Sequence, residues 1–313
     1  FINGSYWGIH HLNERMDEYF IEDYFNIENI DLLSADARIE QGSNSDFLAL
    51  KSYLQTNDLR QEAHYRQVEK WIDIDNLTDY YCAQLFFSNT DWPHNNIKFW
   101  KAQNNGQWRW LFFDCDECMS YENYELLGDF ISEFGVRQDF PEWSTELMHH
   151  LFKSDHFRQS FRYRFNDLLA TTFSTQNLMK HIDETKAMYA PEVNEHCMRW
   201  GAPNTINDWQ EAVKGLYSFA AIRPTAIREQ LTDFFGVPFT IYPNPSNGFI
   251  NIDLFVQDNH FEGLSLKNSM GKEVMSLDQK WTNPLSLNQL KAGVYFVEIQ
   301  LQGHLYTKRL LVF

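Results

Sequence analysis

The sequence has no long apolar run and no recognisable leader. None of its apolar stretches reaches about 18 residues, so we expect no membrane-spanning helix. The chain begins at Phe1 without an initiator Met, and no basic segment followed by an apolar one comes after it. We therefore expect that the sequence opens inside a domain, and the missing leader carries no information on export.

Cysteine is also scarce. Four cysteines are too few for a disulfide framework. Cys115 and Cys118 have the spacing of a CxxC motif, but a zinc site needs two more ligands. The sequence has no second CxxC and no HxxxH motif, which argues against zinc. A local disulfide and a pair of buried thiols both remain open for Cys115 and Cys118.

Basic residues are in the minority. The chain has 26 Lys and Arg against 43 Asp and Glu, which gives a net charge of −17. Residues 238–313 hold six residues of each sign, so the whole excess lies in residues 1–237. Such an acidic body argues against nucleic acid and anionic membranes as partners. It is compatible with divalent cations, although a solvated acidic surface is the commoner explanation.

Aromatic residues, by contrast, make up 16% of the chain, and many of them lie in a predicted β-hairpin. Two apolar, aromatic-rich runs, Ile97–Lys101 and Trp108–Phe113, flank the turn residues 104–106 (Asn-Asn-Gly). Asn-Gly between such runs is a strong hairpin signal. Because a hairpin returns the chain to its starting end, Asn96 and Asp114 are expected at the same end of one ribbon.

Polar residues gather around this end of the hairpin. Asp91 and His94 precede the first strand, and Asp116 follows the second. Carboxylate and amide oxygens are the ligands that Mg²⁺ prefers. The segment therefore predicts a convergent oxygen-ligand site, with ordinary turn residues as the alternative explanation.

Outside the hairpin, residues 1–12 are predicted to form a strand, and most of the remaining sequence up to residue 237 has helical periodicity. Asn13 is expected to cap a helix over Glu14–Phe25, and Pro224 to kink or break a helix over Ile206–Leu231. From Phe239 onward, short β-branched or aromatic runs alternate with turns, which predicts a small antiparallel sandwich. The sequence thus predicts an α+β fold, with domains 1–237 and 238–313.

The C-terminal segment resembles the type A sorting domain of the type IX secretion system, over about the last 75 residues. The resemblance rests on Ile241–Gly248 (IYPNPSNG), Asn268–Val274 (NSMGKEV), Leu290–Val297 (LKAGVYFV) and the closing run Lys308–Val312. It implies a Bacteroidetes-type bacterium, contact with the secretion machinery, and a secreted or surface-displayed protein.

Residues 1–235 resemble the CotH family of spore-coat-H kinase-like proteins. The matching pieces are Asn3–Ile9, Leu12–Arg15, Asn89–Lys98, Trp108–Asp116, Pro141–Trp143, Arg199–Trp200 and Arg223–Pro224. The resemblance implies an atypical protein-kinase fold, with a small sheet and a largely helical lobe. It also implies transfer of the γ-phosphoryl group of ATP to Ser or Thr of a protein substrate, with Mg²⁺ or Mn²⁺.

The resemblance also assigns roles to single residues. Asp91 is the expected catalytic carboxylate, because it precedes Asn96 by five positions, as in kinase catalytic loops. Asn96 and Asp114 are the expected metal ligands, and Asp116 is a candidate second one. His94 is a candidate nucleotide or substrate contact, with a structural hydrogen bond as the alternative.

Two features depart from the family pattern. The family continues after its metal-binding Asp in an Asp-x-Asp-x-Gly-like turn, whereas this chain reads Asp-Cys-Asp-Glu-Cys from Asp114 to Cys118. No Gly-rich phosphate loop is visible, and the phosphate-binding Lys is expected before residue 1. Glu14 is the candidate partner of that Lys, or a first-turn acid of its own helix.

Two other functions remain open on the sequence alone. One is a non-catalytic surface protein that uses a kinase-like scaffold to bind a partner. The other is a nucleotide-sugar transferase, with Asp114 and Asp116 as a DxD metal site.

Overall fold

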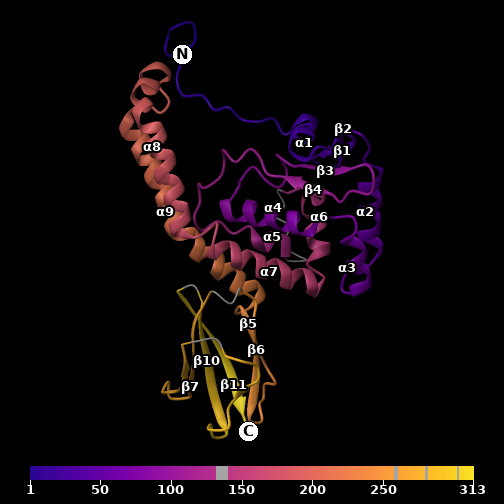
Figure 1. Cartoon of the computed structure of the whole chain (residues 1–313), viewed down its shortest axis with the longest axis vertical. Coiled ribbons are helices and arrows are strands. Elements are labelled where there is room, and N and C mark those ends of the chain that lie inside the picture. Colours follow the sequence, from indigo (N-terminus) through magenta and orange to yellow (C-terminus); the bar gives the residue numbers. More distant parts are fainter. Residues whose placement is uncertain (132–139, 257–259, 279–280, 302) are drawn as a thin grey trace. The chain divides into compact units, whose positions relative to one another are not determined.

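The computed structural model describes residues 1–131, 140–256, 260–278, 281–301 and 303–313 (Figure 1). Within these residues the chain forms two compact units. The first comprises residues 1–158 and 172–227, and the second comprises residues 159–171 and 228–313.

The first unit contains a four-stranded antiparallel sheet in the order β2-β1-β3-β4 (Figure 1). Its strands are β1 (Ile30–Ser34), β2 (Arg38–Gln41), β3 (Lys98–Ala102) and β4 (Arg109–Leu111). The predicted hairpin is confirmed as β3–β4, in which Lys98 pairs with Leu111 and Trp100 pairs with Arg109.

The turn of this hairpin explains its glycine. The backbone N–H of Gly106 donates to the carbonyl oxygen of Ala102 at 3.1 Å. A Cβ atom at position 106 would lie 2.6 Å from the backbone nitrogen of Ala102, so a side chain does not fit there. Asn105 adopts a left-handed φ of 62°, which Asn tolerates better than most residues.

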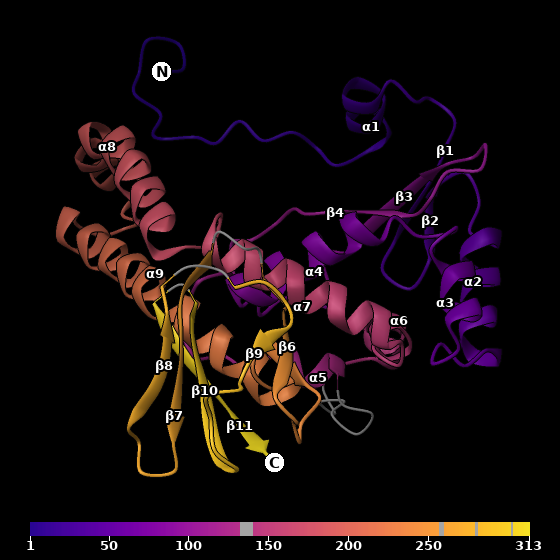
Figure 2. The same cartoon turned by 60° about the horizontal axis from the view of Figure 1, so that its bottom comes forward.

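The two faces of the sheet are covered by different elements, as Figure 2 shows, with α1 on one side and α4 and α6 on the other. On the α1 side, Ile21 packs with a small core formed by Ile30, Leu32, Trp100 and Leu111. On the opposite face, the ring of Phe99 stacks on Trp110 at 5.4 Å and contacts Phe47 of α2 at 4.5 Å. The hairpin is thus held between two apolar layers.

The helices supply the remainder of the first unit. They are α1 (Glu18–Phe25), α2 (Ser45–Thr56), α3 (Glu62–Val68), α4 (Ile74–Phe87), α5 (Leu127–Ile131), α6 (Glu142–Leu151), α7 (Asp155–Ala170), α8 (Thr175–Trp200) and α9 (Ile206–Phe235), of which α7 and α9 also contribute residues to the second unit. Asp73 caps α4 by accepting the N–H of Asn76 at 3.0 Å.

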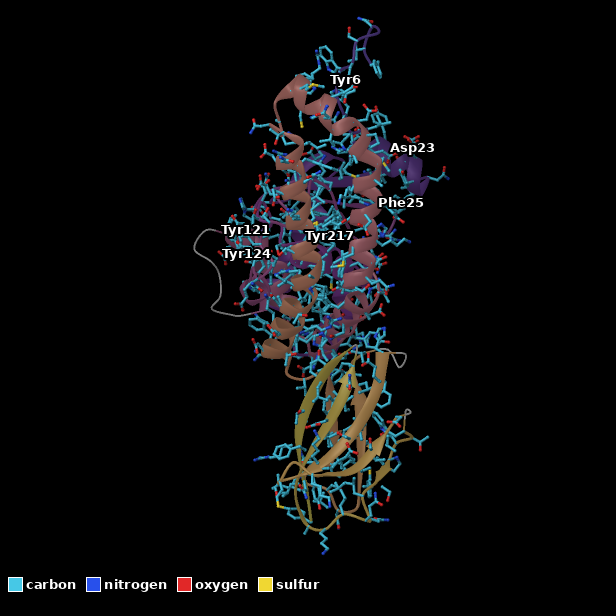
Figure 3. All side chains as sticks on the ribbon, turned by 90° about the vertical axis from the view of Figure 1, so that its left-hand side faces the viewer. Tyr6, Asp23, Phe25, Tyr121, Tyr124 and Tyr217 are labelled. Atoms are coloured by element: carbon cyan, nitrogen blue, oxygen red, sulfur yellow. A yellow bond between two sulfur atoms is a disulfide. The ribbon has the colours of Figure 1, made fainter. Side chains whose placement is uncertain are left out.

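Figure 3 shows α8 and α9 side by side, with Tyr217 labelled on α9. The Tyr217 hydroxyl donates to Asp183 of α8, and Lys186 lies over the Tyr217 ring at 5.6 Å. The helix α9 runs through Pro224 without ending, so the expected break is wrong; a kink at this residue stays a prediction.

The N-terminal segment differs from its prediction. Residues 1–12 form no strand: a tight turn joins Ile2 to Ser5, and the residues after it bond to α8. The N–H of Ile9 donates to His196 at 2.9 Å, and the Trp200 indole donates to the carbonyl oxygen of Trp7 at 2.7 Å. The first helix begins at Glu18 and not at Glu14, because Asp17 caps it by accepting the N–H groups of Tyr19 and Phe20.

The second unit confirms the predicted antiparallel sandwich. One sheet has the order β11-β10-β7-β8 and the other the order β5-β6-β9. The strands are β5 (Phe239–Tyr242), β6 (Phe249–Leu254), β7 (Phe261–Asn268), β8 (Glu273–Leu277), β9 (Leu285–Ser286), β10 (Gly293–Leu301) and β11 (His304–Val312). Alternate residues such as Val297 and Ile299 are fully buried in a core formed by both sheets.

The α+β fold class is therefore confirmed. The expected boundary at 237 lies between the last residue of α9 and the first of β5. None of the helices in the described part of the chain is long and apolar enough to cross a membrane.

Candidate active site

A chain of buried amides fixes the loop that follows α4. The side chain of Asn89, which is fully buried, donates to Gln84 at 2.9 Å. Its Oδ1 accepts the backbone N–H of Asp91 at 3.2 Å. An unpaired polar group in the interior costs about 1–3 kcal/mol, so these hydrogen bonds are strongly favoured. They fix the position of Asp91 in the loop after α4.

The Asp91 carboxylate is held by two amides from the same loop. Its Oδ2 accepts from the side-chain nitrogens of Asn95 at 2.8 Å and Asn96 at 2.9 Å. A carboxylate accepts hydrogen bonds and does not donate them, so Asn96 uses its nitrogen here and its amide oxygen is left for another donor or a cation. Trp92, which follows Asp91 in the sequence, is fully buried, and its indole donates to the hydroxyl of Tyr80 at 2.9 Å.

Asp114 enters from the other strand of the hairpin. The Lys98–Leu111 pair closes this end of the ribbon, so the segments that carry Asn96 and Asp114 leave it together. Partial removal from water raises the pKa of Asp114, and the neighbouring carboxylates of Asp116 and then Asp91 raise it further. The influence of Asp91 on Asp114 places the two flanks of the hairpin within electrostatic reach of each other.

The turn that follows Asp114 is closed by a disulfide between Cys115 and Cys118, with Cα atoms 5.1 Å apart. Of the two alternatives that the sequence left open, a local disulfide and a pair of buried thiols, the structure has the disulfide. Cys82 and Cys197 are buried and are not joined in a disulfide. Met119 ends the turn in a left-handed conformation (φ 62°), and its N–H donates to the carbonyl oxygen of Phe87 at 2.7 Å.

Two side chains from the end of α4 add to this connection. The Ser88 hydroxyl donates to the carbonyl oxygen of Tyr121 at 3.1 Å, and the Thr90 hydroxyl donates to that of Glu117 at 3.3 Å. The turn after Asp114 is therefore bonded to the residues that lead into Asp91, although the two segments are far apart in sequence.

Arg223 supports both segments from the interior. Its guanidinium, which is fully buried, donates to the carbonyl oxygens of Leu85 and Phe86 in α4 and of Glu122 and Tyr124 beyond the turn. Burial lowers the pKa of Arg223 to about 10. Sequence reasoning did not assign this role, although Arg223–Pro224 matches the family pattern and Arg223 lies among apolar residues of α9.

Two predicted site residues have other contacts. Hydrogen bonding to Glu14 raises the pKa of Tyr24, so Glu14 lies beside that tyrosine of α1. The His94 ring stacks on Phe140 with centroids 5.9 Å apart. The nucleotide-binding roles of Glu14 and His94 stay predictions.

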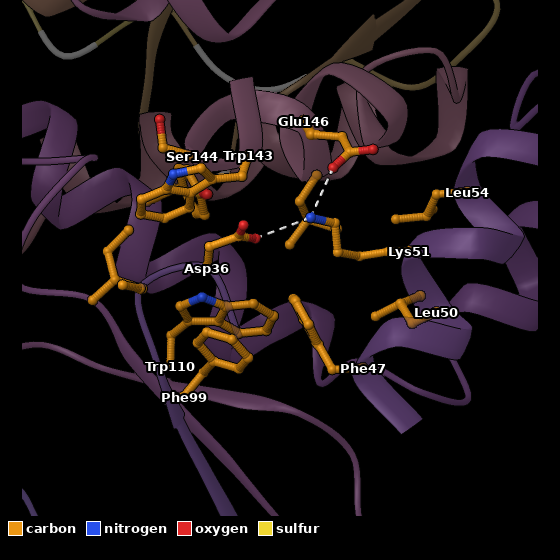
Figure 4. Close-up of a pocket in the computed structure, with 14 residues that line it drawn as sticks. Asp36, Phe47, Leu50, Lys51, Leu54, Phe99, Trp110, Trp143, Ser144 and Glu146 are labelled. Carbon is orange, nitrogen blue, oxygen red and sulfur yellow. Dashed lines mark hydrogen bonds and ion pairs between the residues drawn. The ribbon is translucent and has the colours of Figure 1, made fainter. Parts of the chain in front are cut away.

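A small cavity lies on the sheet face opposite α1, between that face, α2 and α6 (Figure 4). It has a volume of about 40 Å³, and the ammonium of Lys51 lies in it between Asp36 at 3.1 Å and Glu146 at 3.3 Å. Its walls are mainly apolar and include Trp110 and Trp143. A cavity of this size fits a few waters and no nucleotide.

The donor set suits a hard cation. No three His, Cys, Asp or Glu side chains are grouped as a metal site within the residues that the structure describes. The predicted set is of another kind, because it joins the amide oxygen of Asn96 to the carboxylates of Asp114 and Asp116. Oxygen ligands of this kind fit Mg²⁺. The pKa of Asp114 is raised first by partial removal from water and then by the charges of Asp116 and Asp91, and a cation would relieve this repulsion.

A small sheet whose hairpin carries convergent Asp and Asn residues, together with a helical lobe, is typical of kinase-like proteins. The family model described as CotH kinase protein matches residues 1–227. The chain therefore belongs to the CotH family. A second model, described as a secretion system C-terminal sorting domain, matches residues 240–313.

No curated protein matches the chain. The sorting domain makes the protein a secreted or surface-attached one and implies interaction with the secretion machinery. The family and the tail are thus established, while the roles of single residues stay predictions.

Proposed function

We propose that the protein is a secreted or surface-displayed kinase that transfers the γ-phosphoryl group of ATP to Ser or Thr hydroxyls of a protein substrate. The observation that carries the proposal is the grouping at the hairpin end. Asp91 accepts a hydrogen bond from Asn96 at 2.9 Å, and its charge acts on Asp114 across the ribbon. Family membership supports the same reaction.

Asp91 suits the role of the group that orients the acceptor hydroxyl. Two amides fix its carboxylate, so it presents a charged oxygen in a defined position. In the reaction, the hydroxyl oxygen bonds to the γ-phosphorus, the bond to the ADP oxygen breaks, and the hydroxyl proton leaves through Asp91.

Asn96, Asp114 and Asp116 would hold Mg²⁺ or Mn²⁺. When bound, the ion neutralises negative charge on the phosphate oxygens. The protein's own contribution is to keep oxygen ligands from both flanks of the hairpin together at its end.

Labelled ATP with Mg²⁺ or Mn²⁺, and casein or the protein itself as acceptor, tests the proposal. Asp91→Asn and Asp114→Asn are each expected to reduce incorporation by about 10²–10⁴-fold. Asp36→Asn is the matched control, because Asp36 lies in the cavity beside Lys51 and outside the hairpin site. Unchanged incorporation in Asp114→Asn would remove that residue from the mechanism.

A non-catalytic binding scaffold is the second candidate, and one observation favours it. The turn after Asp114 departs from the Asp-x-Asp-x-Gly-like family pattern, because it has no glycine and is closed by a disulfide between Cys115 and Cys118. Under this function, no variant incorporates label, and an Asp91→Ala/Asp114→Ala double variant keeps its partner. Hydrolysis of a nucleotide-sugar donor without use of ATP would instead indicate a DxD transferase.

The sorting domain makes a separate prediction. Removal of residues 238–313 is expected to trap the protein inside the outer membrane, because the matched sorting domain is lost. Surface labelling of intact cells with an antibody measures display. Undiminished surface display of the truncated chain would contradict a sorting role for this domain.

A further inference from the structure

The disulfide lies within the proposed cation-binding turn itself. It joins Cys115 to Cys118, so Asp116 lies inside the closed ring and Asp114 is the residue immediately before it. The charge of Asp116 acts on Asp114, so the two carboxylates lie within electrostatic reach of each other. The covalent ring therefore encloses one carboxylate and borders the other.

A ring this short acts locally. Cross-links stabilise a fold mainly by restricting the unfolded chain, and the effect is smallest for short loops. The backbone is left-handed at Asp114 (φ 55°) and at Met119 (φ 62°), a conformation that non-glycine residues adopt at a cost. The turn between them thus needs support, and the ring supplies it.

The electrostatics point in the same direction. Two carboxylates held close together repel each other unless a cation lies between them. A flexible turn would relieve the repulsion by moving Asp116 away from Asp114. The ring opposes this movement, and the Thr90–Glu117 hydrogen bond at 3.3 Å opposes it from outside the ring.

We propose that the Cys115–Cys118 disulfide is a positioning device that holds Asp114 and Asp116 together for a divalent cation, so that this half of the site forms only in the oxidised protein. This inference rests on the proposed function, because it assumes the cation site. The turn has left-handed residues at Asp114 and Met119 but contains no glycine. The disulfide stabilises this conformation, which glycine would otherwise adopt at lower cost.

The chemistry of assembly is thiol–disulfide exchange. Oxidation removes two electrons and two protons from the Cys115 and Cys118 thiols, and a dithiol–disulfide oxidant of the exported compartment takes them up. The sorting domain marks the chain as an exported protein, and an exported chain leaves the reducing cytoplasm, where disulfides are rare. The cation site is therefore incomplete before export and complete after it.

Binding of Mn²⁺ alone, followed by electron paramagnetic resonance, tests the proposal on the full chain. The oxidised protein is expected to bind Mn²⁺ at least about tenfold more tightly than protein reduced with a phosphine that is then removed. The Cys115→Ser/Cys118→Ser variant is expected to bind like the reduced protein and to ignore the reductant. Cys82→Ala/Cys197→Ala is the matched control and keeps the full response, because neither cysteine is in the turn.

The outcomes separate the two proposals. Equal Mn²⁺ affinity of oxidised and reduced protein, with binding lost in Asp114→Asn, would overturn the role of the disulfide and leave the cation site intact. Absence of Mn²⁺ binding in both redox states would overturn the cation site and, with it, the proposed function. Circular dichroism of the reduced wild type verifies that a loss of binding is not a loss of fold.

Discussion

The two flanks of the hairpin reach the same end of the sheet by different means. The Asp91 loop is fixed from the interior, through Asn89 and Gln84, which are both fully buried. The Asp114 turn is exposed and fixed by a covalent ring and by bonds to neighbouring backbone. One flank therefore depends on the packing of the first unit, and the other depends on redox chemistry.

The difference explains where each flank is vulnerable. A change in the interior should disturb the Asp91 loop and the stability of the unit together, because the same amides serve both. A change in the turn should alter cation binding with little effect on stability. Arg223 is the exception, since it bonds to backbone on both flanks.

The largest expected effect is therefore that of Arg223→Met. The substitution keeps an apolar stem but removes the donor of four carbonyl oxygens, two of them in buried bonds and two in partly buried ones. It should cost about 3–5 kcal/mol of unfolding free energy. Urea denaturation followed by tryptophan fluorescence measures the change. Nine of the ten tryptophans lie in the first unit, so the signal reports on it.

Arg15→Met is the matched control for Arg223→Met. The Arg15 side chain is 87% exposed and pairs only at the surface, so its loss should change stability by less than about 0.5 kcal/mol. Equal stability of the two variants would mean that the buried guanidinium does not support the two flanks.

Asn89→Leu should have an intermediate effect that falls on one flank alone. It removes the bonds to Gln84 and to the Asp91 backbone, at a cost of about 1–3 kcal/mol, and it should lower phosphotransfer more than Mn²⁺ binding. Asn194→Leu, on the exposed surface of α8, is the control. If Asn89→Leu weakened Mn²⁺ binding as much as Asp114→Asn does, the two flanks would not be separable.

The hairpin and its polar end were easier to predict from sequence than the interior contacts that support them. Alternating aromatic residues and Asn-Gly predicted the hairpin, and the side-by-side placement of Asn96 and Asp114 followed from hairpin geometry. Strands β1 and β2 were not predicted, because β1 is buried along its whole length and carries no alternation. The Gln84–Asn89 bond and the Arg223 contacts depend on tertiary packing, which a single sequence does not display.

Three features that the sequence misplaced or left open were decided by the folded structure. Asn13 and Asp17 are both good caps, and Asp17 is the one whose side chain accepts the N–H groups of Tyr19 and Phe20. Pro224 lies inside α9 although proline lacks an N–H group, so its position within a long packed helix outweighed the local penalty. The CxxC spacing allowed a disulfide or thiols, and only the geometry of the turn decided between them.

The smallest effect is expected for Asp114→Asn on the stability of the metal-free protein, and its sign is opposite to that of the interior variants. Partial desolvation, Asp116 and Asp91 raise the pKa of Asp114 in the folded state. A carboxyl group with a raised pKa contributes stability below its unfolded-state pKa and loses it as the pH rises through the folded-state value. At neutral pH its charge therefore destabilises the fold, and the neutral amide should raise the melting temperature by on the order of 1 °C.

Thermal melts in EDTA at pH 7.5 and at pH 3 measure this effect. The gain of Asp114→Asn should disappear at pH 3, where the wild-type carboxyl is protonated as well, and addition of Mg²⁺ should stabilise only the wild type. Asp36→Asn, which loses an ion pair with Lys51, should show no such gain at pH 7.5. A lower melting temperature of Asp114→Asn in EDTA at pH 7.5 would mean that Asp114 serves the fold, and the exposed flank would then resemble the interior one.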